Sequence, residues 1–350
     1  MPRGGAHFSS QELARVLSHY DVGVIHKVKA LSVGNRRAPK VVITSQRGKF
    51  LLKARPRGKD DPFRVAFAHA VQGHLAGKSF PIAPLVATRD ENSTVLQLDN
   101  HIYEFFRFVA GVRYDGSAEA TTDAGRALAK FHRYLKDFAW VPAAPDPSQW
   151  QPLVGSFHDS ATVRRHLRMV AADKRTRPDK ELHVTAEALL ALYNESSIRV
   201  NKLGFDSWDP QVVHGDWHPG NMLFARRKVA AVLDFDSVKV APAVTDLANG
   251  MLQFSIVGGR PNPADWPDYF DEAKLFQFLS GYREITPLQR SELRCLLDLM
   301  IETMIAEAVL PVAATGFFGN LSGLDFLQMI RRKADWLESH RKKLTHAICS

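Results

Sequence analysis

The sequence predicts an α+β protein of two lobes, a small β-rich N-terminal lobe and a larger helical C-terminal lobe. Short β-branched and apolar runs dominate the first hundred residues, whereas long helical patterns dominate after residue 120. Because the two kinds of segment do not alternate, a β-α-β arrangement with a parallel sheet is not expected. The chain has 350 residues, 45% of them hydrophobic, which is enough for two domains with real cores. We place the division between residues 1–106 and 107–350.

Strands and one helix are predicted in the N-terminal lobe. Gln46-Arg47-Gly48 joins two of the strands as a hairpin turn. Asp60-Asp61-Pro62 is a helix start signal, and Pro81 and Pro84 follow the helix that it begins. The predicted strands are 22–31, 40–45, 49–54, 85–88 and 94–98, the predicted helix is 63–77, and an apolar run at 103–109 leads to a passage between the lobes near residues 104–111.

The C-terminal lobe is predicted to be mainly helical. Helices are expected at 121–136, 159–172 and 180–201, and the proline-containing stretch 143–154 is expected to be a loop.

The composition points to a soluble, cytoplasmic protein. The first thirty residues contain no apolar segment typical of a secretory signal. The longest apolar stretch, residues 296–314, is interrupted by three acidic residues and a proline, so a membrane span is not expected. Cys295 and Cys349 are the only cysteines, which argues against a disulfide framework and fits a reducing compartment.

The formal net charge of +9 is concentrated locally. Nine Lys and Arg residues lie between positions 36 and 59 without one acidic residue among them. Such a run attracts phosphate, whether on a nucleotide or on a nucleic acid. Aromatic interleaving, a helix-turn-helix pattern and zinc-ligand spacing are all absent from the sequence around it. A solvated basic face is the favoured interpretation, a nucleotide-phosphate role comes next, and nucleic-acid binding is not expected.

The most informative stretch is His214-Gly215-Asp216-Trp217-His218-Pro219-Gly220-Asn221, which is followed by Leu233-Asp234-Phe235-Asp236. Phosphoryl transfer requires a carboxylate that orients the attacking hydroxyl, together with an amide and a second carboxylate that hold Mg²⁺ on the nucleotide phosphates. The kinase pattern H-R-D-L-x-x-x-N with D-F-G has the same Asp-to-Asn spacing. We therefore predict Asp216 as the catalytic base, with Asn221 and Asp234 as the metal ligands. The two changes in the pattern, Gly215 for Arg and Asp236 for the last Gly, point away from ordinary protein kinases.

These motifs resemble those of the aminoglycoside phosphotransferase and choline kinase superfamily. The resemblance extends through Ala241-Pro242-Ala243 to Asp246-Leu247-Ala248, and it is nearest to the branch of type II homoserine kinases and stress-response kinases. It covers residues 12–260 and implies a two-lobed protein-kinase-like fold, with ATP and Mg²⁺ as cofactors. It also implies a structural role for Asp246, and it leaves the role of Asp236 open.

Lys53 is the predicted nucleotide-binding residue of the small lobe. It stands near a strand end, as in the V-A-I-K arrangement that reaches the α- and β-phosphates, although an exposed strand-edge lysine is the alternative. Gly34 and Asn35 occupy the position of a phosphate-covering loop between the first two strands. Protein kinases orient this lysine with a glutamate from the next helix, but the segment 63–77 contains no acidic residue. We expect nucleotide phosphate alone to orient Lys53, with His69 and Gln72 able to contact it indirectly.

The expected activity is transfer of the γ-phosphoryl group of ATP to a hydroxyl of a small metabolite. Homoserine-like amino alcohols lead, and aminoglycosides, choline and sugars remain open. A cationic acceptor would need an acidic pocket in the helical lobe. The acidic residues available there are more readily interpreted as ordinary solvent-exposed positions. His214 and His218 are expected to have structural roles in their loop. The acidic candidates are Asp265, Asp268, Asp271, Glu272, Glu302 and Glu307.

Two alternatives stand beside this activity. One is a protein serine/threonine kinase, against which the sequence lacks an A-P-E segment and a long activation loop. The other is a degenerate nucleotide-binding module without turnover. The sequence predicts no oligomeric state.

Overall fold

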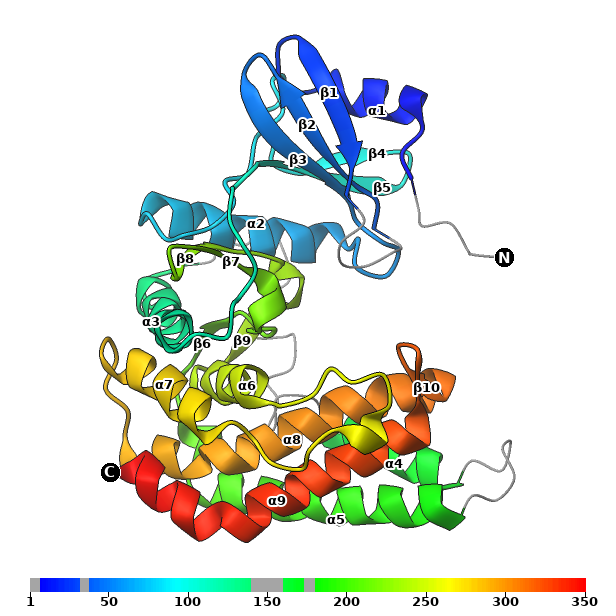
Figure 1. The fold of residues 1–350 in the computed structure, drawn as a ribbon. Helices are drawn as coiled ribbons and strands as arrows, with labels where there is room; N and C mark the ends of the chain where they lie inside the picture. The colour runs from blue at the N-terminus through cyan, green and yellow to red at the C-terminus, as the bar shows by residue number, and fades with distance from the viewer. Residues whose placement is uncertain (1–6, 32–37, 140–159, 173–179) are drawn as a thin grey trace. The chain divides into compact units, whose positions relative to one another are not determined.

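The structure, a computed structural model, describes residues 7–31, 38–139, 160–172 and 180–350 (Figure 1). It consists of two compact units, each of which is discontinuous in sequence. The first unit comprises the described residues of Met1–Tyr114, Tyr134–Asp146 and Asn221–Val238. The second unit comprises those of Asp115–Arg133, Pro147–Gly220 and Lys239–Ser350. The division proposed between residues 106 and 107 stays a prediction.

A five-stranded antiparallel sheet forms the body of the first unit, in the order β1-β2-β3-β5-β4. The predictions for 40–45 and 49–54 are confirmed, and the two strands are joined at Gln46 and Arg47 as expected. The edge strand β1 is exposed along its length and carries Lys27 and Lys29, which disfavour pairing with another chain. The strands are β1 (Ile25–Ala30), β2 (Lys40–Ser45), β3 (Gly48–Ala54), β4 (Leu96–Leu98) and β5 (His101–Arg107).

The period-two alternation of side chains gives this sheet two different faces. Phe50, Leu52 and Phe105 are buried in a core with Val16 and Leu17 of helix α1 (Ser10–Leu17). Helix α1 was not predicted from the sequence, although Ser9 and Glu12 form a capping box at its start. Lys53 and Glu104 alternate with the core residues and so lie on the opposite face.

Helix α2 (Pro62–Gly77) confirms the predicted helix at 63–77, and the Asp61 side chain caps its first turn. The predicted strand at 85–88 is wrong. Leu85 forms only an isolated bridge with Phe106, and Val86 donates a single backbone hydrogen bond to Phe105. The apolar residues of this segment pack against the sheet without continuing its ladder.

A hairpin from the middle of the chain also belongs to the first unit. Strands β7 (Met222–Ala225) and β8 (Lys228–Val232) pair antiparallel around Arg226 and Arg227. Both turn residues have positive φ, +49° and +61°, as a tight two-residue hairpin turn requires. The turn is one residue shorter than the Arg226-Arg227-Lys228 turn that the sequence suggested.

The second unit is mainly helical, which together with the β-rich first unit confirms the α+β prediction. The helices expected at 121–136, 159–172 and 180–201 are present with small shifts of their ends, and β6 (Pro210–Val213) pairs with β9 (Lys239–Pro242). The segment 143–154, predicted as a loop, lies outside the described residues. The helices are α3 (Ala118–Tyr134), α4 (Ser160–Ala172), α5 (Lys180–Lys202), α6 (Val244–Ser255), α7 (Glu272–Arg283), α8 (Arg290–Thr315) and α9 (Gly323–Cys349).

Helix α8 runs through the middle of this unit (Figure 1). Its residues are buried along most of its length. Helices α4, α5, α6 and α9 pack around it. Helices α3 and α7 approach closely through reciprocal glycines: a Cβ atom at Gly125 would lie 2.1 Å from the Phe278 carbonyl oxygen, and one at Gly281 would lie 2.0 Å from that of Thr122. Within the described ranges, none of the helices combines the length and apolar character needed to cross a membrane.

Candidate active site

Lys53 lies in a buried network of charges in the first unit. The register of β3 and β5 places it directly opposite Glu104, and its Nζ atom lies 3.6 Å from Glu104 Oε2. The same Nζ atom lies 3.0 Å from an oxygen of Asp236 and 3.3 Å from Asp234 Oδ1. Arg55 directly follows the core residue Ala54 at the end of β3. It donates a hydrogen bond to Glu104 at 2.8 Å, and its guanidinium lies 3.0 Å from an oxygen of Asp236. Two cations are thus shared among three carboxylates.

The charges in this network stabilise one another against the cost of burial. Burial by itself would raise the pKa of Glu104, which is only 1% exposed. Lys53, a hydrogen bond with His69 and the charge of Arg55 outweigh it and hold the pKa of Glu104 well below its ordinary range. Burial would lower the pKa of Lys53, but Glu104 and the two aspartates raise it above its usual value. Both groups are therefore ionised throughout the physiological range.

The expectation that nucleotide phosphate alone orients Lys53 is wrong. The helix does lack an acidic residue, but the neighbouring strand β5 supplies the carboxylate through Glu104. The predicted indirect contact of His69 is confirmed, because its Nε2 atom lies 2.9 Å from Glu104 Oε1. Gln72 donates to the Ala68 carbonyl oxygen instead. The helix therefore holds the glutamate, and the glutamate holds the lysine.

The β7–β8 hairpin brings Asn221 and Asp234 to the same end of the two strands. The Leu233 amide donates to the Asn221 carbonyl oxygen at 2.9 Å, so Asn221 lies across the hairpin from the residue before Asp234. Asp234 itself has φ +60° and ψ 70°, a left-handed conformation that is uncommon outside glycine. Lys53 and other nearby lysines lower the pKa of its carboxyl despite burial. Asn221 and Asp234 together offer the amide and carboxylate oxygens that a hard divalent cation prefers as ligands.

The two aspartates of the Leu233-Asp234-Phe235-Asp236 motif differ in environment. The Asp236 carboxylate is almost covered and accepts two hydrogen bonds from Lys53, at 3.0 and 3.2 Å. Burial and the neighbouring charge of Asp234 raise its pKa. Asp234 is more exposed, with a side chain 39% accessible to solvent. Asp236 is thus suited to holding Lys53 and Arg55, whereas the carboxylate of Asp234 is accessible to a ligand from solvent.

In the second unit, the fully buried carboxylate of Asp246 anchors the start of the 214–221 loop. Asp246 accepts backbone N–H hydrogen bonds from His214 at 2.6 Å and from Gly215 at 2.9 Å, and it lies 3.2 Å from His132 Nε2. Burial raises the pKa of a carboxyl, but His132 and the backbone donors lower that of Asp246 below its usual value. The side chain of Trp217 is also fully buried, beside Phe131. The loop is therefore held from both sides of Asp216.

His218 reaches back toward Asp216 within the same loop. The Gly220 amide donates to His218 Nδ1 at 3.0 Å, which places the ring proton on Nε2 when the imidazole is neutral. That Nε2 atom lies 3.5 Å from Asp216 Oδ2. The two side chains are thus directed at each other, a contact that was not predicted from the sequence. The spacing of His218 two residues after Asp216 was the available signal.

Glu307 on α8 is the acidic residue whose charge bears on Asp216. Gln253 of α6 donates to it at 3.1 Å. Burial, followed by the negative charge of Asp216, raises the pKa of Glu307 to about 7. Lys239 lies in the same electrostatic environment, and burial lowers its pKa to about 8. Two other acidic candidates form salt bridges instead, Asp268 with Arg332 at 2.7 Å and Glu272 with Lys343 at 2.8 Å.

Four of the six predicted site residues are thus placed by the structure. Lys53, Asn221 and Asp234 belong to the first unit and Asp216 to the second, and only four residues of the continuous 214–221 loop separate Asp216 from Asn221. Gly34 and Asn35 lie outside the described residues.

The fold and these motifs define a phosphotransferase with a kinase-like architecture. The model described as "Phosphotransferase enzyme family" (APH) matches residues 27–288, well over half of the chain. The chain therefore belongs to the APH phosphotransferase family.

Homoserine kinases are among its relatives. The homoserine kinase of Rhodopseudomonas palustris is 27% identical over 335 residues, which cover 94% of this chain and 85% of that protein. The homoserine kinase of Bradyrhizobium diazoefficiens is 26% identical over 337 residues, covering 94% and 85%.

Similar solved structures confirm the kinase-like fold. The amicoumacin kinase hAmiN, in complex with AMP-PNP, Ca²⁺ and Ami, has a TM-score of 0.67 at 14% identity and covers 94% of this chain and 93% of that one. An aminoglycoside phosphotransferase from Alicyclobacillus acidocaldarius has a TM-score of 0.66 at 19% identity, covering 99% of each chain. Choline kinase from Cryptosporidium parvum has a TM-score of 0.62 at 14% identity, covering 97% and 98%.

Family membership and these relatives identify the activity at the level of reaction class. The protein is an ATP-dependent kinase that phosphorylates a hydroxyl group of a small molecule.

Proposed function

We propose that the protein transfers the γ-phosphoryl group of ATP to the hydroxyl of a homoserine-like amino alcohol, with Mg²⁺ as the metal. The observation that carries the acceptor class is the buried Glu307 carboxyl, whose charge couples to that of Asp216. Burial and the negative charge of Asp216 raise the pKa of Glu307 to about 7, so an acceptor that brings a positive charge would be favoured because it stabilises the ionised form of Glu307. The homoserine kinase relatives agree with this acceptor class.

Asp216 is the proposed catalytic base. It would accept a hydrogen bond from the acceptor hydroxyl and receive its proton late, because the transition state of phosphoryl transfer is loose. His218, whose Nε2 atom lies 3.5 Å from Asp216, restricts the orientation of that carboxylate. The anchored loop thus presents one oriented carboxylate to the acceptor hydroxyl.

Asn221 and Asp234 are the residues that would hold Mg²⁺. An amide oxygen and an ionised carboxylate fit a cation that takes few ligands from protein and others from phosphate and water. When bound, the ion neutralises charge on the nucleotide phosphates. Lys53 and Gly34-Asn35 are the proposed nucleotide contacts, and Glu104 keeps Lys53 charged for the phosphates.

Two observations disfavour the alternatives. Only residues 235–243 separate Asp234 from α6, which leaves no room for the long activation loop on which protein kinases seat a peptide. Against a degenerate binder, the Asp216, Asn221 and Asp234 set that phosphoryl transfer requires is intact, and Asp246 fixes the backbone beside Asp216. Both features favour turnover of a small acceptor.

The test is transfer of labelled phosphate from ATP, with and without Mg²⁺, to an acceptor panel. The panel contains homoserine, choline, an aminoglycoside, a sugar, a general protein substrate and water. We expect homoserine to be preferred and transfer to depend on Mg²⁺. Preferred labelling of the protein substrate would establish the protein-kinase alternative, and a blank panel with intact ATP binding would establish the non-catalytic module.

A matched pair of acceptors tests the role of Glu307. 4-Hydroxybutyrate has the hydroxyl and the carboxylate of homoserine but lacks its ammonium group. Because a hydrogen bond to a charged group contributes roughly 1.5–3 kcal/mol, Glu307→Gln should raise the KM for homoserine on the order of tenfold or more and leave that for 4-hydroxybutyrate nearly unchanged. Glu187→Gln, at an exposed position of α5, is the control and should change neither value. Equal effects on both acceptors would contradict ammonium recognition by Glu307.

A further inference from the structure

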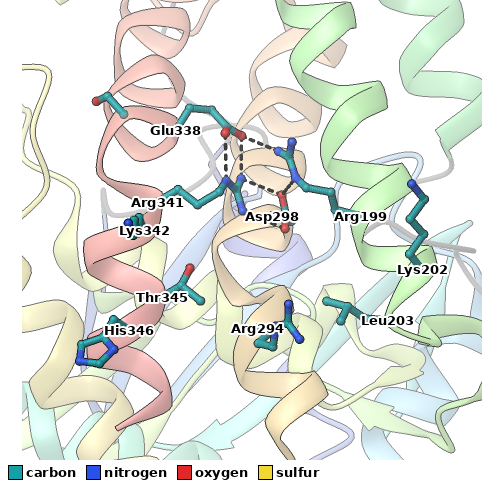
Figure 2. A pocket seen from close by; sticks show the side chains of 11 residues that line it. Arg199, Lys202, Leu203, Arg294, Asp298, Glu338, Arg341, Lys342, Thr345 and His346 are labelled. Atoms are coloured by element: carbon teal, nitrogen blue, oxygen red, sulfur yellow. Dashed lines mark hydrogen bonds and ion pairs between the residues drawn. The ribbon is translucent and has the colours of Figure 1, made fainter.

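A pocket of about 640 Å³ lies among helices α5, α8 and α9 of the second unit (Figure 2). It contains no residue of the 214–221 loop and no residue of the Lys53 network. Its volume is within the range of about 300–1,000 Å³ that is typical of small-molecule sites. The lining residues are Arg199, Lys202, Leu203, Arg294, Asp298, Glu338, Ser339, Arg341, Lys342, Thr345 and His346.

One end of the pocket is an ion-pair network that ties the three helices together. Arg341 donates to Asp298 at 2.8 and 3.0 Å and to Glu338 at 2.6 and 2.9 Å. Arg199 donates to Asp298 at 2.8 Å and also to Glu338 (Figure 2). Burial would raise the pKa of Glu338, but hydrogen bonds from Arg341 lower it. Among the residues that line the pocket, two guanidinium groups thus balance two carboxylates; Arg199 also lies 3.6 Å from Glu195, which does not line the pocket.

The rest of the pocket is cationic. Lys202 from α5, Arg294 from α8 and Lys342 from α9 line it, and His346 lies one turn after Lys342 (Figure 2). The three Lys and Arg side chains are exposed, and none of them forms a salt bridge with another described residue. Thr345, which is half-buried, adds a hydroxyl donor. Beyond the balanced network, the pocket therefore carries an excess of three positive charges.

Helical spacing explains how these side chains reach one site. Arg294 precedes Asp298 by four residues, and Lys342 precedes His346 by four, so each pair lies on one face of its helix. Because the network ties the three helices together, the backbone positions that carry the cations are fixed before any ligand arrives, whereas the exposed side chains themselves are not. Preorganisation of this kind reduces the cost of binding.

We propose that this pocket is a binding site for a small, multiply charged phosphate compound, separate from the phosphotransfer site. Lysine ammonium groups act as point charges toward phosphate oxygens, and the guanidinium of Arg294 offers paired donors. A concave site lined by three helices fits a compact ligand better than an extended nucleic-acid backbone, which would need a longer basic track.

The proposal is tested with inorganic diphosphate, titrated calorimetrically into the full-length protein without magnesium. The pocket variant is Lys202→Glu combined with Arg294→Glu. The control is Arg165→Glu combined with Arg168→Glu, two exposed arginines of α4 that change the net charge equally. We expect the pocket variant to lose at least tenfold in diphosphate affinity and the control to lose less than threefold. The milder pair Lys202→Gln and Arg294→Gln should give an intermediate loss, and thermal unfolding verifies that each variant is folded.

Four outcomes would overturn the proposal. The first is a wild-type protein that does not bind diphosphate at millimolar concentration, and the second is an equal loss in the α4 control, which would show a general charge effect. The third is a loss only in Lys53→Ala, which would place the diphosphate in the nucleotide site. The fourth is succinate binding as tightly as diphosphate, or a DNA oligonucleotide depending on the pocket more strongly, since either would assign the pocket to another ligand class.

Discussion

Glu104→Gln is the most direct test of how Lys53 is held. The substitution keeps the shape of the side chain and removes its charge from between Lys53 and Arg55. At an effective dielectric constant of about 20, a unit charge at 3.6 Å contributes roughly 4–5 kcal/mol of gross Coulomb energy. Asp236 keeps its contacts at 3.0 Å with both cations, so the net loss must be smaller. We expect a decrease of about 3 kcal/mol in the free energy of unfolding, typical of breaking a buried ion pair.

The same variant should also slow phosphoryl transfer, because Lys53 would turn toward the two aspartates and away from the phosphates. Loss of one positioned electrostatic contact costs on the order of a hundredfold in turnover. Steady-state kinetics with varied ATP and urea unfolding measure the two effects separately. Since the pKa of Glu104 is depressed in the folded protein, its contribution is present above its ordinary value of 4.5 and is lost as the pH falls below it. The stability difference between variant and wild type should therefore shrink in acid.

Lys333→Met is the control for instability alone. Lys333 is buried on α9 and donates to the Pro267 carbonyl oxygen at 2.8 Å, so its removal should destabilise the second unit by about 1–3 kcal/mol. It should leave kcat/KM for ATP within about twofold of wild type in folded protein. If Glu104→Gln keeps both normal turnover and normal stability, or if Lys333→Met slows turnover as much, the role assigned to Glu104 is wrong.

The remaining predictions concern the 214–221 loop and its neighbours. Asp216→Asn should lower kcat by roughly 10²–10⁴-fold while ATP still raises the melting temperature; near-normal kcat would exclude it as the base. Asp234→Asn should weaken Mg²⁺-dependent ATP binding as well, and unchanged calorimetric affinity would contradict its role as a ligand. Asp246→Asn should lower the free energy of unfolding by about 3 kcal/mol and reduce kcat, because it accepts two backbone N–H groups; a fully stable, active variant would remove the anchor assignment. Glu307 ionises near pH 4.5 in the unfolded chain but only near pH 7 in the folded protein. The free energy of unfolding should therefore fall by up to about 3 kcal/mol as the pH rises from 4.5 to about 7. Glu307→Gln should flatten this part of the stability profile, and an unchanged slope would show that another group causes it.

Much of the fold could be predicted because its signals are local. The strand at 40–45 and the helix at 63–77 are encoded by patterns and start signals within their own windows, and both are present. The capping box of Ser9 and Glu12 was an equally local signal for α1, and it was available in the sequence. The strand predicted at 85–88 is absent because its signal was not specific to a strand. The apolar residues of this segment pack against the sheet without forming the continuous backbone hydrogen bonds of a strand pair.

The sequence by itself determined the reaction class and the main site candidates of this protein. Asp216, Asn221 and Asp234 stand at short intervals on one loop and one hairpin, so chain geometry alone makes their spacing informative. Only the tertiary structure revealed Glu104 as the partner of Lys53, because that pairing depends on the register between β3 and β5, which are far apart in the chain. The same holds for Glu307, whose pKa responds to Asp216 across 91 positions of sequence. A buried charged group stays ionised only if oppositely charged or hydrogen-bonding groups surround it. Those groups can belong to strands and helices far apart in the sequence, so only the tertiary structure identifies them.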